Sequence, residues 1–203
     1  MSITEKFHKS FVYDRRMNQL HKHISGIINQ FNIKNILDIG AGDGKIDSLL
    51  VKDTNVNITG IDVLVRPNTY IPVEEYDGLH INKLDNSVDA SMMIDVLHHT
   101  ERPEKVFSEA VRVSKKYIII KDHILSSTLS YVKLKMMDYV GNKHYNVNLP
   151  YNYMKSKVWI KIIKENNLKI VYLNKNLHLY KGLLHLLFDS NLHFLVVLEK
   201  KGG

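Results

Sequence analysis

The chain has 203 residues, of which 44% are hydrophobic and 24% charged, as in an ordinary globular domain. It contains no cysteine, which excludes disulfides, thiolate metal sites and a cysteine nucleophile, and this agrees with a cytoplasmic protein. The N-terminus lacks the apolar core of a signal peptide, no apolar run is long enough to span a membrane, and the net charge of +7 comes from dispersed lysines, which favours a solvated basic surface.

A helix over residues 3–31 is the first element that the sequence predicts. Apolar side chains recur there at three- and four-residue spacing: Phe7, Phe11, Met17, Leu20, Ile24, Ile27, Ile28 and Phe31. His21 and His23 are two positions apart and face different directions on a helix, so they do not form a metal pair. We expect this helix to lie over the turn that follows the first strand.

Residues 35–44, Asn-Ile-Leu-Asp-Ile-Gly-Ala-Gly-Asp-Gly, predict a short buried strand that breaks into a glycine-rich turn. Gly40, Gly42 and Gly44 let the backbone adopt positive φ and let a ligand lie against the main chain. A helix is expected from Lys45, so its amide groups and its positive end point into the turn. This is the opening half of a nucleotide-binding βαβ unit.

A second strand over residues 58–61 ends in Asp62. A carboxylate at this place can accept hydrogen bonds from both hydroxyls of a ribose, in a NAD site or in another adenosine site. The dinucleotide fingerprint requires a third glycine where this chain has Lys45, which disfavours a NAD-dependent oxidoreductase.

Strands and helices continue to alternate up to residue 123. We expect a third strand before Tyr76, a fourth over 88–94 and a fifth over 117–120, with an amphipathic helix from Pro103 between the last two. Further on, the sequence predicts a helix near 129–140, a helix over 155–166, and strands over 168–173 and 193–198. The tyrosine-rich loop over 141–153 is too long for a plain connection.

Four segments in this order resemble motifs of the class I S-adenosylmethionine-dependent methyltransferases, in particular the type 11-like methyltransferase domain. They are the turn from Asp38 to Gly44, the strand ending in Asp62, residues 85–99, and residues 109–114 before the fifth strand. The resemblance is close over residues 34–123 and holds in outline elsewhere.

The resemblance implies an α/β fold: a Rossmann-like three-layer sandwich around a seven-stranded, mostly parallel sheet whose last strand is antiparallel. It implies one methyltransferase domain over 1–203, with an N-terminal helical cap over 1–31 and a cofactor-binding core over 34–123. A substrate-covering insertion over 124–155 and a C-terminal helix with the final strands over 156–203 complete it.

The same resemblance implies how the cofactor, S-adenosyl-L-methionine, is bound. Asp38 is expected to hold its ammonium group, Asp62 its ribose and Asp77 its adenine amino group, while Arg15 pairs with its carboxylate. The expected cofactor-binding residues are Tyr13, Arg15, Asp38, Gly40, Ala41, Gly42, Gly44, Asp62, Val63, Asp77, Gly78 and Asp95.

Histidines follow the fourth and fifth strands, and open α/β sheets bind ligands at the carboxyl ends of their parallel strands. The expected catalytic residues are His123, His99 and Asp95, with a histidine as the candidate general base. The expected acceptor-binding residues are His144, Tyr145, Tyr151 and Tyr153. Asp122 beside His123 supplies two ligands, which do not define a metal site, so no metal is expected.

The sequence therefore predicts methyl transfer to a small molecule, with oxygen as the expected acceptor atom. An RNA methyltransferase is one alternative, because the charge is +7 and because Asp95, Lys121 and Glu199 partly match the tetrad used for ribose 2′-O-methylation. Against it, an antiparallel last strand places Glu199 at the end of the sheet opposite the cofactor. A cofactor-binding, non-catalytic partner subunit is the other alternative, and the oligomeric state stays open.

Overall fold

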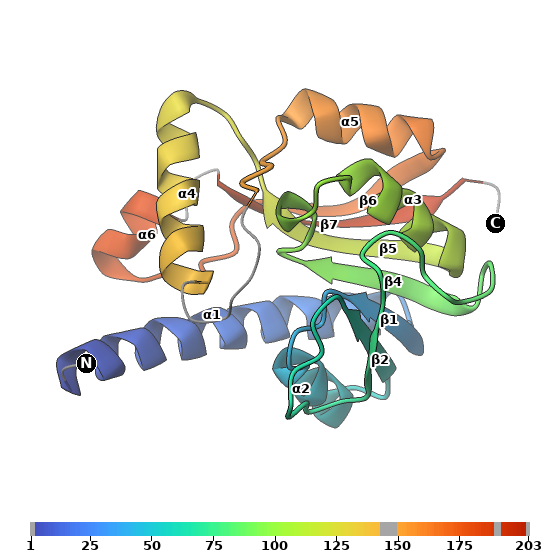
Figure 1. Cartoon of the computed structure of the whole chain (residues 1–203), viewed down its shortest axis with the longest axis horizontal. Coiled ribbons are helices and arrows are strands. Elements are labelled where there is room, and N and C mark those ends of the chain that lie inside the picture. The colour runs from blue at the N-terminus through green and yellow to red at the C-terminus, as the bar shows by residue number, and fades with distance from the viewer. Residues whose placement is uncertain (1–2, 143–149, 189–191, 202–203) are drawn as a thin grey trace.

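The computed structural model of the chain describes residues 3–142, 150–188 and 192–201. Within these ranges, seven strands form one sheet in the order β3-β2-β1-β4-β5-β7-β6 (Figure 1). β7 runs antiparallel between β5 and β6, and the remaining strands are parallel to one another, as predicted. The strands are β1 (Asn35–Ile39), β2 (Asn57–Asp62), β3 (Val73–Glu75), β4 (Val88–Ile94), β5 (Ser114–His123), β6 (Leu168–Asn174) and β7 (His193–Lys200).

Helices cover both faces of the sheet and form the expected three layers (Figure 1). The N-terminal helix α1 and helix α2 lie on one face, and α3 and α5 lie on the other. The helices are α1 (Ile3–Gln30), α2 (Lys45–Asp53), α3 (Pro103–Val113), α4 (Thr128–Asn142), α5 (Ser156–Glu165) and α6 (Gly182–Phe188), with a 3₁₀ turn η1 at Leu97–His99. None of the helices in the described ranges is long and apolar enough to cross a membrane.

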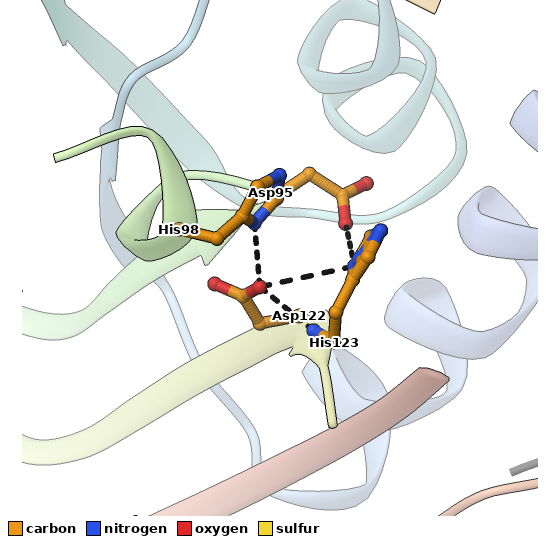
Figure 2. A group of neighbouring side chains, drawn as sticks. All are labelled: Asp95, His98, Asp122 and His123. Carbon is orange, nitrogen blue, oxygen red and sulfur yellow. Dashed lines mark hydrogen bonds and ion pairs between the residues drawn. The ribbon is translucent and has the colours of Figure 1, made fainter. Parts of the chain in front are cut away.

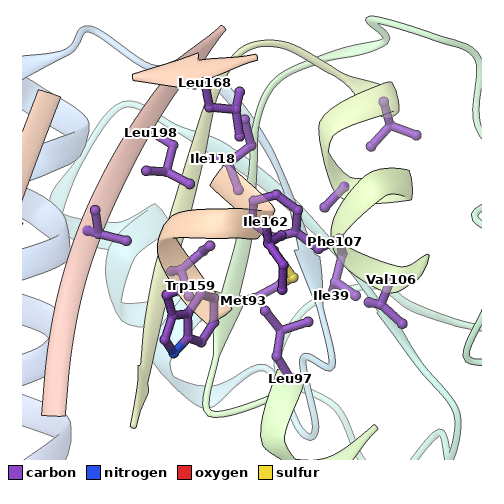
Figure 3. Close-up of a cluster of buried hydrophobic side chains, with 14 of the residues drawn as sticks. Ile39, Met93, Leu97, Val106, Phe107, Ile118, Trp159, Ile162, Leu168 and Leu198 are labelled. Carbon is purple, nitrogen blue, oxygen red and sulfur yellow. The ribbon is translucent and has the colours of Figure 1, made fainter. Parts of the chain in front are cut away.

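Alternation along the central strands produces the two cores. In β5, Ile118 and Ile120 point to the layer of α3 and α5, whereas Ile119 points to the layer of α1 and α2. The first layer is shown in Figure 3, where Phe107 of α3 and Trp159 of α5 pack against the same face of the sheet. The sheet is thus buried on both sides, which explains why its central strands are nearly continuous apolar runs.

β5 is longer than its apolar run predicts. The sequence predicts a strand over 117–120, but β5 extends to His123 and buries three further polar residues: Lys121, Asp122 and His123. These residues stand at the carboxyl end of the strand, next to the carboxyl end of β4. Helices α4 and α6 and the first part of α1 lie beyond this edge of the sheet (Figure 1). The fold therefore encloses a polar cluster between the sheet edge and these helices.

Candidate active site

The glycine-rich turn joins β1 to α2 and is tied to the end of β2. The amides of Gly40 and Ala41 both donate to the carbonyl oxygen of Ile61, at 2.8 and 3.2 Å. Gly40 has φ +76°, and a Cβ there would lie 2.6 Å from Cγ2 of Val96. Both the backbone conformation and the space around this position therefore require glycine.

Two carboxyl groups are buried behind this turn. Asp38 of β1 is 3% exposed and Asp47, in the first turn of α2, is fully buried. Among the described residues, no hydrogen-bond donor is in position for Oδ1 of Asp38 or for either oxygen of Asp47. Burial, reinforced by the neighbouring Asp47, raises the pKa of Asp38 well above its ordinary value, and burial raises the pKa of Asp47 to about 6. Within the described ranges no cationic side chain contributes to the pKa of either carboxyl group, and a bound ammonium group would supply the missing positive charge.

Asp62 lies at the end of β2, where the sequence places the ribose-binding carboxylate. Its Oδ2 accepts the amide hydrogen of Gly42 at 2.8 Å, and its Oδ1 accepts that of Leu64 at 3.0 Å. Each oxygen keeps a second lone pair, so the carboxylate is oriented by the turn and can still accept two hydroxyl groups. Val63 follows it and is exposed.

Asp77 is held in a local turn. Its Oδ1 accepts the amide hydrogens of Leu79 and His80 at 2.7 and 2.6 Å, and its Oδ2 lies 2.9 Å from Nδ1 of His80. The backbone hydrogen bond from His80 is the largest of the effects that lower the pKa of Asp77 to about 2. The structure thus accounts for Asp77 and Gly78 as a turn, and their contact with adenine stays a prediction.

Tyr13 and Arg15 of α1 do not lie together. Tyr13 faces the start of α2, where Nζ of Lys45 is 5.0 Å from the centre of its ring. Nη2 of Arg15 donates to the carbonyl oxygen of His178 at 3.0 Å. The next residue, Arg16, points instead to Asp95, and the sequence did not single it out.

Asp95 ends β4 between two cations. One oxygen is paired with Arg16, and the other lies 2.5 Å from Nζ of the fully buried Lys121. Burial opposes ionisation of this carboxyl group, but Lys121 and Arg16 hold its pKa well below the ordinary value. Asp95 is therefore a fixed anion whose two oxygens are both engaged, and it cannot serve as a proton acceptor at neutral pH.

The histidines expected from the sequence meet at this edge (Figure 2). Nδ1 of His98 lies 2.6 Å from Oδ1 of Asp122, and the same oxygen is 3.8 Å from Nδ1 of His123, so Asp122 orients His98 more closely than its neighbour His123. Nδ1 of His123 lies 3.3 Å from Oδ1 of Asp95. Burial and the adjacent His98 lower the pKa of His123 well below its ordinary value and that of His99 to about 4. His99 and His123 are thus neutral at pH 7.

Helix α4 adds a carboxylate to this group. Asp138 of α4 is 3.4 Å from Nε2 of His98 and 3.9 Å from Nε2 of His123. The hydroxyl of Tyr153 donates to Asp138, and the ring of Tyr153 stacks on His123 with centroids 5.9 Å apart. Tyr153 therefore belongs to the polar cluster, and its role in binding the acceptor stays a prediction.

The other expected acceptor-binding residues are less central. Tyr151 is half-buried and lines a shallow cavity of about 300 Å³ against α4, with Val132, Lys135, Met136 and Tyr139. His144 and Tyr145 lie outside the described residues. Glu199 pairs with Lys169 and Lys116 beside Tyr117, at the start of β5, so the tetrad considered for ribose methylation is not assembled.

Sequence reasoning missed Arg16, Asp47, Asp138 and His193, whose Nδ1 lies 3.3 Å from Nζ of Lys121, and it considered Lys121 only in the alternative of ribose methylation. For two of them a signal was present. Lys121 directly follows three isoleucines of a buried strand, and Asp138 interrupts the apolar pattern of its helix. Burying a charged side chain within an apolar segment costs free energy unless an oppositely charged group pairs with it, so such a residue indicates a buried partner. Arg16 and His193 depend on contacts between segments distant in the sequence, and Asp47 depends on how α2 packs behind the turn.

Comparison with known proteins gives one family and a set of similar folds. The profile of a family described as "Methyltransferase domain" matches residues 37–119. No curated protein matches the chain.

Among solved structures, a putative sarcosine dimethylglycine methyltransferase from Galdieria sulphuraria is 16% identical, with 89% of this chain and 85% of that chain covered and a TM-score of 0.63. Magnesium protoporphyrin IX methyltransferase from Synechocystis PCC 6803, with bound SAH, is 12% identical, with 91% and 84% covered and a TM-score of 0.61. A chain from the complex between the Haloferax volcanii Trm112 methyltransferase activator and the putative methyltransferase is 10% identical, with 82% of each chain covered and a TM-score of 0.60. At such identities the likeness shows the fold alone.

Proposed function

We propose that this chain, whose residues 37–119 match the profile of a methyltransferase domain, is a class I methyltransferase that transfers the methyl group of S-adenosyl-L-methionine to an oxygen atom of a small-molecule acceptor. The observation that supports the proposal is the buried carboxyl pair, Asp38 and Asp47, which lies directly behind the glycine turn and has no cationic partner in the part of the chain that the structure describes. The ammonium group of the cofactor fits this pair, and its ribose hydroxyls fit Asp62 at the end of the next strand.

When bound, S-adenosyl-L-methionine supplies a methyl group already activated on a sulfonium centre. The residues of the chain have three tasks: to hold the cofactor, to align the acceptor with it, and to take up the acceptor's proton. The glycine turn and its carboxylates serve the first task, and the polar cluster at the ends of β4 and β5 serves the other two.

We assign the proton uptake to His123. Its Nδ1 is buried and has no hydrogen-bond partner within the described part of the chain, and its ring is neutral at pH 7. The ionised carboxylate of Asp95 lies 3.3 Å from that nitrogen. A fixed anion at this distance stabilises the imidazolium that forms when the ring accepts a proton. His99 is the second candidate, and Asp95 acts by orienting and stabilising.

The side chains on α4 and around Tyr151 favour a methyl acceptor that has an apolar part. Leu129, Val132 and Met136 of α4 are exposed, and the shallow cavity beside Tyr151 is lined mainly by apolar side chains. Exposed apolar side chains grouped on one helix next to a polar cluster favour a molecule with an apolar body and a reactive hydroxyl.

The test is a thermal-shift titration with S-adenosylmethionine, S-adenosylhomocysteine and NAD. A ligand at 100 times its dissociation constant stabilises the folded state by about 2.7 kcal/mol, which raises the midpoint by roughly 5–11 °C for a chain of this size. We expect a rise with the first two ligands and none with NAD, and a smaller rise for the Asp38→Asn variant. The absence of any rise with the two adenosyl ligands would refute the proposed cofactor.

A further inference from the structure

A second group of potential ligands lies beside the proposed acid–base histidine. It consists of His98 and His99 of η1 and Asp138 of α4, whose nearest ligand atoms all lie within 4.8 Å of one another. Nε2 of His98 is 3.4 Å from Oδ2 of Asp138. In a tetrahedral zinc site with bonds of about 2.1 Å, neighbouring ligand atoms are about 3.4 Å apart. These two atoms therefore stand at the spacing of two ligands that share one ion.

Two imidazole nitrogens of this group make no hydrogen bond within the described ranges, although Nε2 of His98 lies in ion-pair range of Asp138. His98 is 1% exposed, and within the described ranges its Nε2 makes no hydrogen bond. Nδ1 of His99 is also buried without a hydrogen bond there. The two rings lie with their centroids 4.0 Å apart, and a cation bound between them and Asp138 would give buried imidazole nitrogens that lack a hydrogen bond a common partner.

The outer contacts are those of a metal site. Nδ1 of His98 bonds to Asp122 at 2.6 Å, which orients the ring and leaves Nε2 directed toward Asp138. The hydroxyl of Tyr153 bonds to Asp138. Histidine ligands are ordinarily held by a carboxylate at their other nitrogen, and carboxylate ligands by a further hydrogen bond. His98 and Asp138 both have this support.

A competing set on the other side of His98 is less suited to an ion. Asp95, His98, Asp122 and His123 also lie within 4.8 Å of one another. However, both oxygens of Asp95 are already engaged by Arg16 and Lys121. Two fixed positive charges at this position repel a metal ion, whereas the group around Asp138 lies on the opposite side of the His98 ring.

We propose that His98, His99 and Asp138 bind one divalent transition-metal ion, with zinc as the reference ion, at the carboxyl end of β4. Two imidazoles and one carboxylate suit such a metal better than magnesium or calcium. Three protein ligands leave a coordination position open, as in catalytic zinc sites. An oxygen of the methyl acceptor can occupy that position. This last role rests on the proposed function, but the metal binding does not.

From the sequence no metal is expected, because Asp122 and His123 were the ligands considered. η1 and α4 change this by placing two other histidines against a carboxylate forty residues away. Among these ligands, Asp138 lies farthest along the chain from the other two, so its contact with them follows from the fold and not from local sequence.

The experiment uses untagged full-length protein, stripped with a chelator, dialysed, and titrated calorimetrically with Zn²⁺ and, separately, with Mg²⁺. We expect one zinc ion per chain and no binding of magnesium. Asp138→Asn and His99→Gln should each weaken zinc binding about tenfold or more. His21→Gln is the matched control, because His21 also contacts a carboxylate, that of Asp53 at 3.2 Å, but lies away from the site. Its zinc affinity should equal that of the unaltered chain.

A second readout does not depend on the folding of any variant. Co²⁺ added to the stripped, unaltered chain should give the visible absorption of a nitrogen- and oxygen-bound ion, and zinc should displace it. Failure of the unaltered chain to bind zinc at one ion per chain, or zinc affinity unchanged in both variants, would overturn the proposal. Stabilisation by S-adenosylhomocysteine without zinc binding would support the proposed function and refute the metal site. Zinc binding without stabilisation by S-adenosylhomocysteine would support the metal site and refute the proposed cofactor.

Discussion

Replacing Asp47 with asparagine tests whether the two carboxyl groups behind the glycine turn share a proton in the folded protein. Asp47 is fully buried against Asp38, and a hydrogen bond between the two side chains is among the effects that set its pKa. Asparagine has nearly the same shape, carries no charge, and can donate a hydrogen bond to Asp38. The substitution therefore removes the like-charge conflict without opening a cavity.

The magnitude follows from the pKa of Asp47, which burial raises from 3.8 to about 6. A difference of this size corresponds to about 3 kcal/mol of folding free energy. The protonated carboxyl group is favoured in the folded state, so this contribution is fully present below about pH 4 and is lost as the pH rises through about 6. Asp38, whose pKa is also raised, acts in the same direction.

We therefore expect the unaltered chain to lose about 3 kcal/mol of stability between pH 4 and pH 7 that Asp47→Asn does not lose. Urea unfolding at several pH values, followed by circular dichroism, measures this difference directly. Asp53→Asn is the control, because Asp53 lies in the same helix with its side chain 53% exposed, and its curve should run parallel to that of the unaltered chain. Parallel curves for the Asp47→Asn variant and the unaltered chain would show that the pair does not hold a proton.

Three further substitutions test the cofactor site, the proton acceptor and the turn. Asp62→Ala should weaken S-adenosylhomocysteine binding about 10- to 100-fold in calorimetry, because two charge-assisted hydrogen bonds to ribose are lost. His123→Ala should leave that affinity unchanged and lower kcat by roughly 10²–10⁴-fold in a methyl-transfer assay. Gly44→Ala should cost about 1–3 kcal/mol in urea unfolding, because φ is +71° and the new Cβ would lie 2.4 Å from Cγ1 of Ile71.

Each of these has an outcome that contradicts the reasoning. If Asp62→Ala binds S-adenosylhomocysteine as tightly as the unaltered chain, Asp62 does not bind the ribose. If His123→Ala keeps its turnover, another residue is the proton acceptor. Gly26→Ala is the matched control for the third, because nothing lies within 4 Å of the added Cβ in α1, where alanine is expected to stabilise. A Gly44→Ala variant as stable as the unaltered chain would show that the turn tolerates a side chain.

Local patterns were sufficient for most of the strands and for the glycine turn, whereas the mostly parallel sheet with its antiparallel last strand was implied by the family resemblance. Glycine spacing at 40–44 and apolar runs such as 118–120 depend on residues that are neighbours in the chain, so these strands and the positions of Asp38 and Asp62 on them could be predicted. The sequence did not predict which arginine of the N-terminal helix reaches the site, because that depends on how the helix packs. Arg15 and Arg16 are adjacent on α1 and point about 100° apart, and only the way α1 packs on the sheet decides that Arg16 meets Asp95.

The polar cluster shows the same limit over a longer distance. Asp138 follows an irregular stretch, and no periodicity relates α4 to the ends of β4 and β5. Its contact with His98 and Tyr153 exists because the chain returns across the sheet edge. The extension of β5 to Lys121 and His123 was hidden for a related reason: polar residues look like the end of a strand unless their buried partners are known.

The position of β7 also has a consequence for how the chain assembles. β7 is the second neighbour of β5, and β6 is attached to the sheet only through β7. Neither pairing can form before β7, which begins at His193, is in place. Until then, the backbone edge of β5 and its isoleucines 118–120 are open to pairing with another chain. Such long-range pairing is slow to form, and refolding yields should therefore fall as the protein concentration rises.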